Sequence, residues 1–203
     1  MTGSASSRSF YNYFSSMQEL FAALSYSITH SFMIVVRAEM AKMASAAEQC
    51  DAGQRYFLDR ARNDAAWGWA MVHIGAMGPL FGAETSAAAE HTISDGIRAG
   101  EFVIADAGVG RDLMLGKAHA AILTHLRQGS APDMPQVASR AVLAGLGVPK
   151  AVIDRVVKRD LPALWSASRP ASVRCSLSGG TDRARRTRAN VSRGDQRKAP
   201  EHA

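Results

Sequence analysis

A run of hydroxyl and aromatic side chains near the start of the chain, from Ser7 to Phe14, is its most informative feature. Hydroxyl, amide and guanidinium groups on one short helix can hydrogen-bond the phosphates and base edges of DNA. Phe10 and Phe14 are four residues apart, so they share one helix face and we expect them to pack inward. The remaining faces carry the candidates for DNA contact, which are Arg8, Ser9, Tyr11 and Asn12. A second interpretation stays open, in which the aromatic cluster only caps the helix that follows it.

Other kinds of chemistry are not supported by the spacing of the residues. Gly110 to Ala118 superficially resembles a phosphate-binding loop, but Arg111 stands where a glycine is needed. Ala118 also replaces the Ser or Thr that would hold magnesium. The six histidines show no metal-binding spacing such as H-x-x-x-H. We therefore expect no enzyme activity, no metal and no cofactor.

Charge divides the sequence into a neutral part and a basic tail. Residues 1–165 contain 15 Lys and Arg and 15 Asp and Glu, whereas residues 166–203 contain nine and three. The net charge of +6 therefore comes from the tail and gives no argument for nucleic-acid binding by the rest. The tail has almost no large apolar residues, so we expect it to be disordered. Either it attracts phosphates as a basic arm or it has no folded role.

The sequence predicts neither export nor a membrane span. The N-terminus lacks a charged segment followed by an apolar one, and no stretch reaches about 18 uncharged apolar residues. Cys50 and Cys175 form no paired motif, so we expect one buried thiol and one exposed thiol in the tail. We therefore expect a cytoplasmic protein.

Apolar residues recur every three to four positions along most of the chain, which predicts an all-α fold. Ser16 followed by Glu19 predicts the start of a long helix at about Met17. Cys50–Gly53 predicts a break, and Gly78-Pro79 predicts a helix end because proline lacks an amide donor. The predicted helices cover residues 17–47, 55–63, 65–77, 84–99, 111–127 and 136–146, with a last helix opening at Pro149.

Two parts of the sequence resemble the TetR/AcrR transcriptional regulators. Residues 5–14 and the following Ser16–Leu20 are similar to the family's recognition helix and the start of its next helix. Ile97–Phe102, the helix from Arg111 and the turn Gly145–Pro149 are similar to the end of the family's regulatory domain. Together the resemblance covers about residues 2–165.

The resemblance implies a DNA-binding repressor that a small, hydrophobic effector releases from its operator. It implies a remnant of a helix-turn-helix head in residues 1–24, a helical effector-binding and dimerisation domain in residues 25–165, and the tail in residues 166–203. Within the head, it places Tyr11 and Tyr13 on phosphates, and it places Ser7, Arg8 and Asn12 near bases.

Two departures from the family lead us to expect weak or absent operator binding. Family members have two helices before this segment, which supply the apolar partners of Phe10 and Phe14. They also usually have Lys, which contacts a phosphate, where this chain has Met17. The alternative is a DNA-silent module for ligand binding and dimerisation, left by a late start.

The resemblance also names a ligand-binding set and a homodimer set. The ligand-binding set holds bulky, adaptable side chains, namely Tyr56, Phe57, Trp67, Trp69, Met71, His73, Met77 and Phe81, with His73 or Asp64 as the polar anchor. The dimer set lies on two late helices and comprises Leu115, Ala118, Ala121, Ile122, Ala138, Ala141 and Gly145. For both sets the alternative is that the residues belong to the ordinary core.

Overall fold

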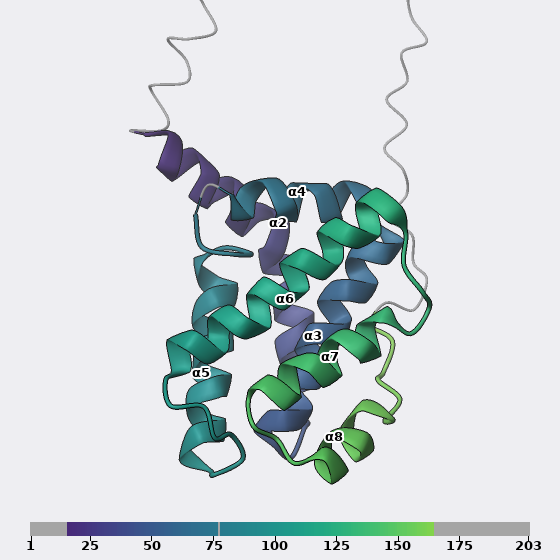
Figure 1. Cartoon of the computed structure of the whole chain (residues 1–203). Helices are drawn as coiled ribbons and strands as arrows, with labels where there is room; N and C mark the ends of the chain where they lie inside the picture. The colour runs from purple at the N-terminus through teal and green to yellow at the C-terminus, as the bar shows by residue number, and fades with distance from the viewer. Residues whose placement is uncertain (1–15, 77, 165–203) are drawn as a thin grey trace, which may run out of the picture. The chain divides into compact units, whose positions relative to one another are not determined.

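The computed structural model of the chain describes residues 16–76 and 78–164, and this part is helical without strands (Figure 1). The all-α fold predicted from the sequence is confirmed. The seven helices are α2 (Met17–Met40), α3 (Ala46–Asn63), α4 (Ala65–Gly75), α5 (Ala83–Arg98), α6 (Ala107–Gln128), α7 (Met134–Gly145) and α8 (Lys150–Val157).

Most of the predicted helix ends agree with the structure to within a few residues. The hydroxyl of Ser16 accepts a hydrogen bond from the Glu19 amide at 3.1 Å, so α2 begins where its capping pattern predicts. The break predicted at Cys50–Gly53 is wrong, because these residues lie inside α3. The chain breaks earlier, between Met40 and Ala46, where Ser45 caps α3 by accepting from the Glu48 amide at 3.2 Å.

Helix α3 is the centre of the bundle and contacts each of the other six described helices. Every residue from Cys50 to Leu58 is buried, so this stretch of the helix has no solvent face. The buried stretch is also polar in sequence, because Asp51, Gln54 and Arg55 lie within it. That combination explains why Asp51 and Gly53 give the false signal of a loop.

The buried polar groups of α3 fasten it to the helices that follow. Asp51 accepts a hydrogen bond from the Ser139 hydroxyl at 2.6 Å and pairs with Arg55 at 3.1 Å. Arg55 also donates to the carbonyl of Arg159 at 2.8 Å, just beyond α8. Burial raises the pKa of Asp51, while the Ser139 hydrogen bond and the Arg55 charge act in the opposite direction. The pair ties α3 to α7 and to the end of α8.

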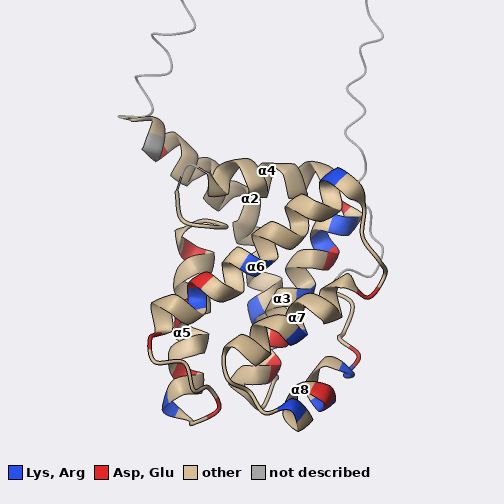
Figure 2. Cartoon of the chain, viewed as in Figure 1, with Lys and Arg blue, Asp and Glu red and all other residues tan. Residues whose placement is uncertain are grey.

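Helix α2 is unusually apolar. From Glu19 to Met40 it is long and apolar enough to cross a membrane by length and composition alone. Phe32, Met33 and Val36 of this helix are buried in the core of the bundle. Lys, Arg, Asp and Glu are interspersed over the other helices, while α4 carries none of them (Figure 2).

The segments named together in the sequence analysis also meet in space. The Glu101 carboxylate accepts from the amides of Ala46 at 3.2 Å and Ala47 at 3.0 Å, and so it caps the N-terminus of α3. Phe102 packs over Gly96, where any Cβ would overlap its ring. The next amide, that of Val103, donates to the carbonyl at the end of α7. This loop therefore positions the central helix.

Replacing Glu101 by alanine should lower the free energy of unfolding by about 1–2 kcal/mol, because it removes both the acceptors and a negative charge from a helix N-terminus. Urea denaturation followed by circular dichroism measures the loss. Glu101→Gln keeps one acceptor oxygen without the charge and should lose less. An unchanged midpoint for Glu101→Ala would show that the cap does not support α3.

Candidate ligand-binding site

A small cavity of about 40 Å³ lies between α2, α3, α5 and α6, and is called here the inner cavity. Its lining is almost entirely apolar. The residues around it are Met33, Val36, Arg37 and Met40 from α2, Gly53, Gln54 and Phe57 from α3, Phe81 before α5, Thr85, Ala88, Ala89 and Thr92 from α5, and Met114, Leu115 and Ala118 from α6.

Two buried side chains that line the inner cavity have unused hydrogen-bonding groups. Gln54 is 1% exposed, and neither its amide nitrogen nor its amide oxygen has a partner among the described residues. The Thr85 hydroxyl, also buried, has none either. By contrast, the hydroxyl of Thr92 donates to the carbonyl of Ala88 at 3.1 Å. An unsatisfied buried polar group costs about 1–3 kcal/mol of stability, so Gln54 and Thr85 destabilise the folded state.

A glycine and three methionines keep the wall of the inner cavity thin and adaptable. A Cβ on Gly53 would lie 3.2 Å from Cε of Met114 and 3.7 Å from Sδ of Met40, so an alanine side chain would occupy this wall. Glycine inside a helix costs about 1 kcal/mol relative to alanine. Methionine side chains, including that of Met33, can move at little cost. The lining can therefore enlarge.

Aromatic rings close one end of the inner cavity. Phe57 and Phe81 meet edge to face, with ring centroids 5.2 Å apart at 71°. Phe81 has a φ of 59°, a left-handed backbone conformation that is unfavourable for a bulky residue. Its ring is 1% exposed, and this packing holds the backbone there. Such outliers are found at ligand-binding and switching segments.

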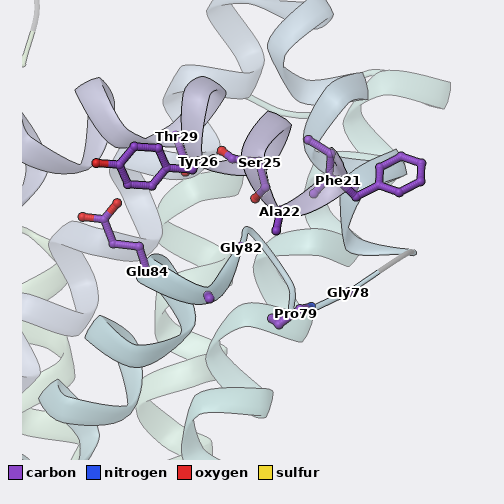
Figure 3. Close-up of a pocket in the computed structure, with 11 residues that line it drawn as sticks. Phe21, Ala22, Ser25, Tyr26, Thr29, Gly78, Pro79, Gly82 and Glu84 are labelled. Carbon is purple, nitrogen blue, oxygen red and sulfur yellow. Dashed lines mark hydrogen bonds between the residues drawn. The ribbon is translucent and has the colours of Figure 1, made fainter. Parts of the chain in front are cut away.

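A second, open pocket of about 440 Å³, called here the outer pocket, lies between α2 and the connection from α4 to α5 (Figure 3). At its edge Glu84 pairs with His30 at 3.0 Å and with Arg37 at 3.1 Å, which joins α5 to α2. Its other lining residues are Phe21, Ala22, Ser25, Tyr26, Thr29, Ile74, Gly78, Pro79, Gly82 and Ala83.

The two hollows follow one another along the same pair of elements. On α2, the outer pocket takes residues between Phe21 and Thr29, and the inner cavity takes residues from Met33 onward. On the opposite side, Gly82–Glu84 line the outer pocket and Thr85 lines the inner cavity. The volume of the outer pocket lies within the usual range for small-molecule sites. The outer pocket has one buried hydroxyl without a partner among the described residues, that of Ser25, whereas the inner cavity has the unpaired groups of Gln54 and Thr85.

The ligand-binding set predicted from the sequence is spread over the bundle. Phe57 and Phe81 line the inner cavity, Trp67 packs against Phe57 at 5.8 Å between ring centroids, and Met71 is buried in the core. The remaining members lie elsewhere: the Tyr56 hydroxyl donates to the carbonyl of Pro162 at 3.1 Å, Trp69 and His73 are exposed and adjacent, Asp64 caps α4, and Met77 lies outside the described residues.

The other predicted sets divide in a similar way. Within the single chain, Leu115, Ala118, Ala121, Ile122 and Ala138 of the dimer set are buried, whereas Ala141 and Gly145 are exposed on α7. The DNA-contact residues Ser7, Arg8, Ser9, Tyr11, Asn12 and Tyr13 lie outside the described residues, as does the tail. In the part that the structure describes, no three His, Cys, Asp or Glu side chains gather as a metal site would require.

Sequence reasoning missed Gly53, Gln54 and Thr85, which are the most informative residues of the inner cavity. One signal was available in retrospect. Gly53 and Gln54 are adjacent in the interior of a helix, and Asp51 and Arg55 flank them at the four-residue spacing of a helical ion pair. This pattern indicates a buried helix whose polar groups have specific partners.

Comparison with known proteins identifies the protein family to which this fold is related. Residues 45–159 match the family model described as "Tetracyclin repressor-like, C-terminal domain". The fold is similar to that of RolR solved without ligand, with a TM-score of 0.65 and 25% identity over 77% of this chain and 81% of RolR. It is also similar to RolR in complex with resorcinol, with a TM-score of 0.67 and 27% identity over 77% of this chain and 78% of that one. No curated protein matches the chain.

The family match spans more than half of the sequence, and it covers α3 to α8, the helices that surround the central one. Its start agrees with the Ser45 cap of α3 and its end with Arg159, which Arg55 binds. The chain therefore belongs to the TetR family of transcriptional regulators.

Proposed function

We propose that the protein is a cytoplasmic, homodimeric, DNA-binding repressor of the TetR family whose effector is a small hydrophobic molecule bound in the inner cavity. The observation that carries this proposal is a small apolar cavity in which Gln54 and Thr85 hold polar groups that the described residues leave unpaired. Pockets for small molecules have this composition, with apolar walls and a few polar groups that fix orientation.

The similarity to RolR in complex with resorcinol supports a small aromatic effector. A cavity of ~150 Å³ holds one benzene molecule, so the inner cavity of about 40 Å³ must enlarge to bind such a ring. The thioethers of Met33, Met40 and Met114 supply the movement. Ligand binding is then coupled to the positions of the helices that carry them.

Helix α2 is the connection between ligand and DNA in this proposal. It is one continuous helix from Met17 to Met40, about 36 Å long at 1.5 Å per residue. Its C-terminal half lines the inner cavity, and its N-terminus directly follows the predicted DNA-contact residues. An effector that binds the DNA-incompetent arrangement of α2 more tightly shifts the population toward it.

The DNA-binding part of the proposal assigns phosphate contacts to Tyr11 and Tyr13 and places Ser7, Arg8 and Asn12 near the bases, with Ser9 also facing the DNA. We expect repeated selection of random duplexes on the full chain to enrich a palindrome at micromolar protein, and resorcinol to release it. Tyr11→Phe should weaken binding about 5–10-fold for all sequences, because it removes one phosphate hydrogen bond. Failure to enrich any sequence would remove DNA from the function and leave the ligand site to be judged separately.

Resorcinol at about 100 times its Kd should raise the Tm by about 5–10 °C, because binding to the native state adds about 2.7 kcal/mol. Gly53→Ala should raise the Tm without ligand by about 2–4 °C through helix propensity, and should shrink the resorcinol shift because its methyl group fills the cavity wall. Differential scanning fluorimetry and calorimetry measure both effects.

Gly116→Ala is the matched control for this experiment. Gly116 also lies inside a helix, but nothing lies within 4 Å of its Cβ position. This variant should gain stability like Gly53→Ala and keep the full resorcinol shift. Equal resorcinol shifts in both variants would move the ligand out of the inner cavity, for example to the outer pocket.

Dimerisation is proposed through the exposed members of the predicted dimer set on α7, Ala141 and Gly145, where small side chains allow close helix approach. Ala141→Glu should convert a dimer to a monomer in sedimentation velocity, because it buries an unpaired charge. Ala87→Glu, on the exposed side of α5, should leave the dimer intact. A dimer that persists in Ala141→Glu would place the interface on another face.

A further inference from the structure

We infer that Gln54 and Thr85 recognise the hydroxyl groups of an uncharged phenol-type effector, so that the inner cavity selects for hydrogen bonding as well as for shape. This inference rests on the proposed function, since it concerns the ligand of the same cavity. It is carried by the contrast between Asp51 and Arg55, which have hydrogen-bond partners within the protein, and Gln54 and Thr85, whose side-chain polar groups have none among the described residues.

The first step is that the charged side chains on either side of Gln54 have hydrogen-bond partners within the protein, although the described residues leave Nε of Arg55 without one. Asp51 and Arg55 lie on either side of Gln54 and hydrogen-bond to each other, to Ser139 and to carbonyl oxygens beyond α8. Only the carboxamide of Gln54 faces apolar neighbours with both its donor and its acceptor unused by the described residues. Such a group destabilises the fold, and hydrogen bonds from a bound ligand would satisfy it.

The second step is that Thr85 adds a polar group from α5 to the same cavity. Its hydroxyl is both a donor and an acceptor, as is the Gln54 carboxamide taken as a whole. A phenolic hydroxyl is complementary to this pair because it also donates and accepts. Water can occupy a cavity of about 40 Å³, and the ligand hydroxyl then replaces it bond for bond.

The third step excludes a charged ligand. Arg37 is the one ionisable residue that lines the inner cavity, and its guanidinium is paired with Glu84 at 3.1 Å and is 47% exposed. A carboxylate in the inner cavity would therefore be buried without a counter-charge, which is strongly unfavourable. An aromatic ring, in contrast, extends the edge-to-face contact of Phe57 and Phe81.

The test compares resorcinol with m-xylene, which has nearly the same shape but carries methyl groups in place of the hydroxyls. Calorimetry on the full chain gives the ratio of the two affinities. Gln54→Met should lower the preference for resorcinol about 10–100-fold, and Thr85→Val about 5–10-fold. Both variants should keep or raise the Tm, because each removes an unsatisfied polar group.

Thr92→Val is the matched control, because Thr92 lines the same cavity but its hydroxyl is already bonded within α5. It should change the ratio less than about twofold. In the unaltered chain, 3-hydroxybenzoate should bind at least about 100-fold more weakly than resorcinol, because its carboxylate has no partner.

The outcomes separate the inference from the function on which it rests. If the unaltered chain binds resorcinol and Gln54→Met and Thr85→Val keep the same preference, the inference is overturned and the ligand site remains. Tight binding of 3-hydroxybenzoate would also overturn it. If the unaltered chain binds neither resorcinol nor m-xylene, the proposed effector class fails, and this inference fails with it.

Discussion

The burial of a polar helix is the constraint on which the rest of this structure depends. Helix α3 is surrounded by the other described helices, and its polar groups have lost water along with its apolar ones. Each of them must find a partner inside the protein or destabilise it. Asp51 and Arg55 meet this demand by bonding α7 and the end of α8, which explains why the last helices pack where they do. Gln54 does not meet it within the described residues, and so we propose that the ligand binds at this position.

The ends of the helices could be predicted because the signals for them are local. Ser16 caps α2, Gly100 follows α5 with a left-handed backbone, and Pro149 precedes α8, each through contacts within a few residues. The extent of α3 could not be predicted in this way. Helices that are distant in the sequence pack around α3 and bury it, so residues 46–63 alone do not predict its burial.

The candidate site, like the helices, could be predicted only where the signal is local in the sequence. Bulky aromatic residues suggest a pocket from the sequence, and two of those predicted, Phe57 and Phe81, do border the inner cavity. The other predicted residues have different roles; for example, the Tyr56 hydroxyl donates a hydrogen bond to the carbonyl of Pro162, beyond α8. Gln54 and Thr85 resemble ordinary surface residues in a linear sequence. Only the crossing of α3 with α5 shows that they face the same hollow, because that crossing removes both from water.

The position of Cys50 at the core of α3 has a practical consequence. Burial, together with the nearby carboxylates of Glu101 and Asp51, raises the pKa of this thiol far above its ordinary value. A protonated, inaccessible thiol resists alkylating reagents while the bundle is closed. Modification of Cys50 therefore requires the helices around it to separate, and its rate reports cooperative opening of the folded unit rather than fraying at a helix end.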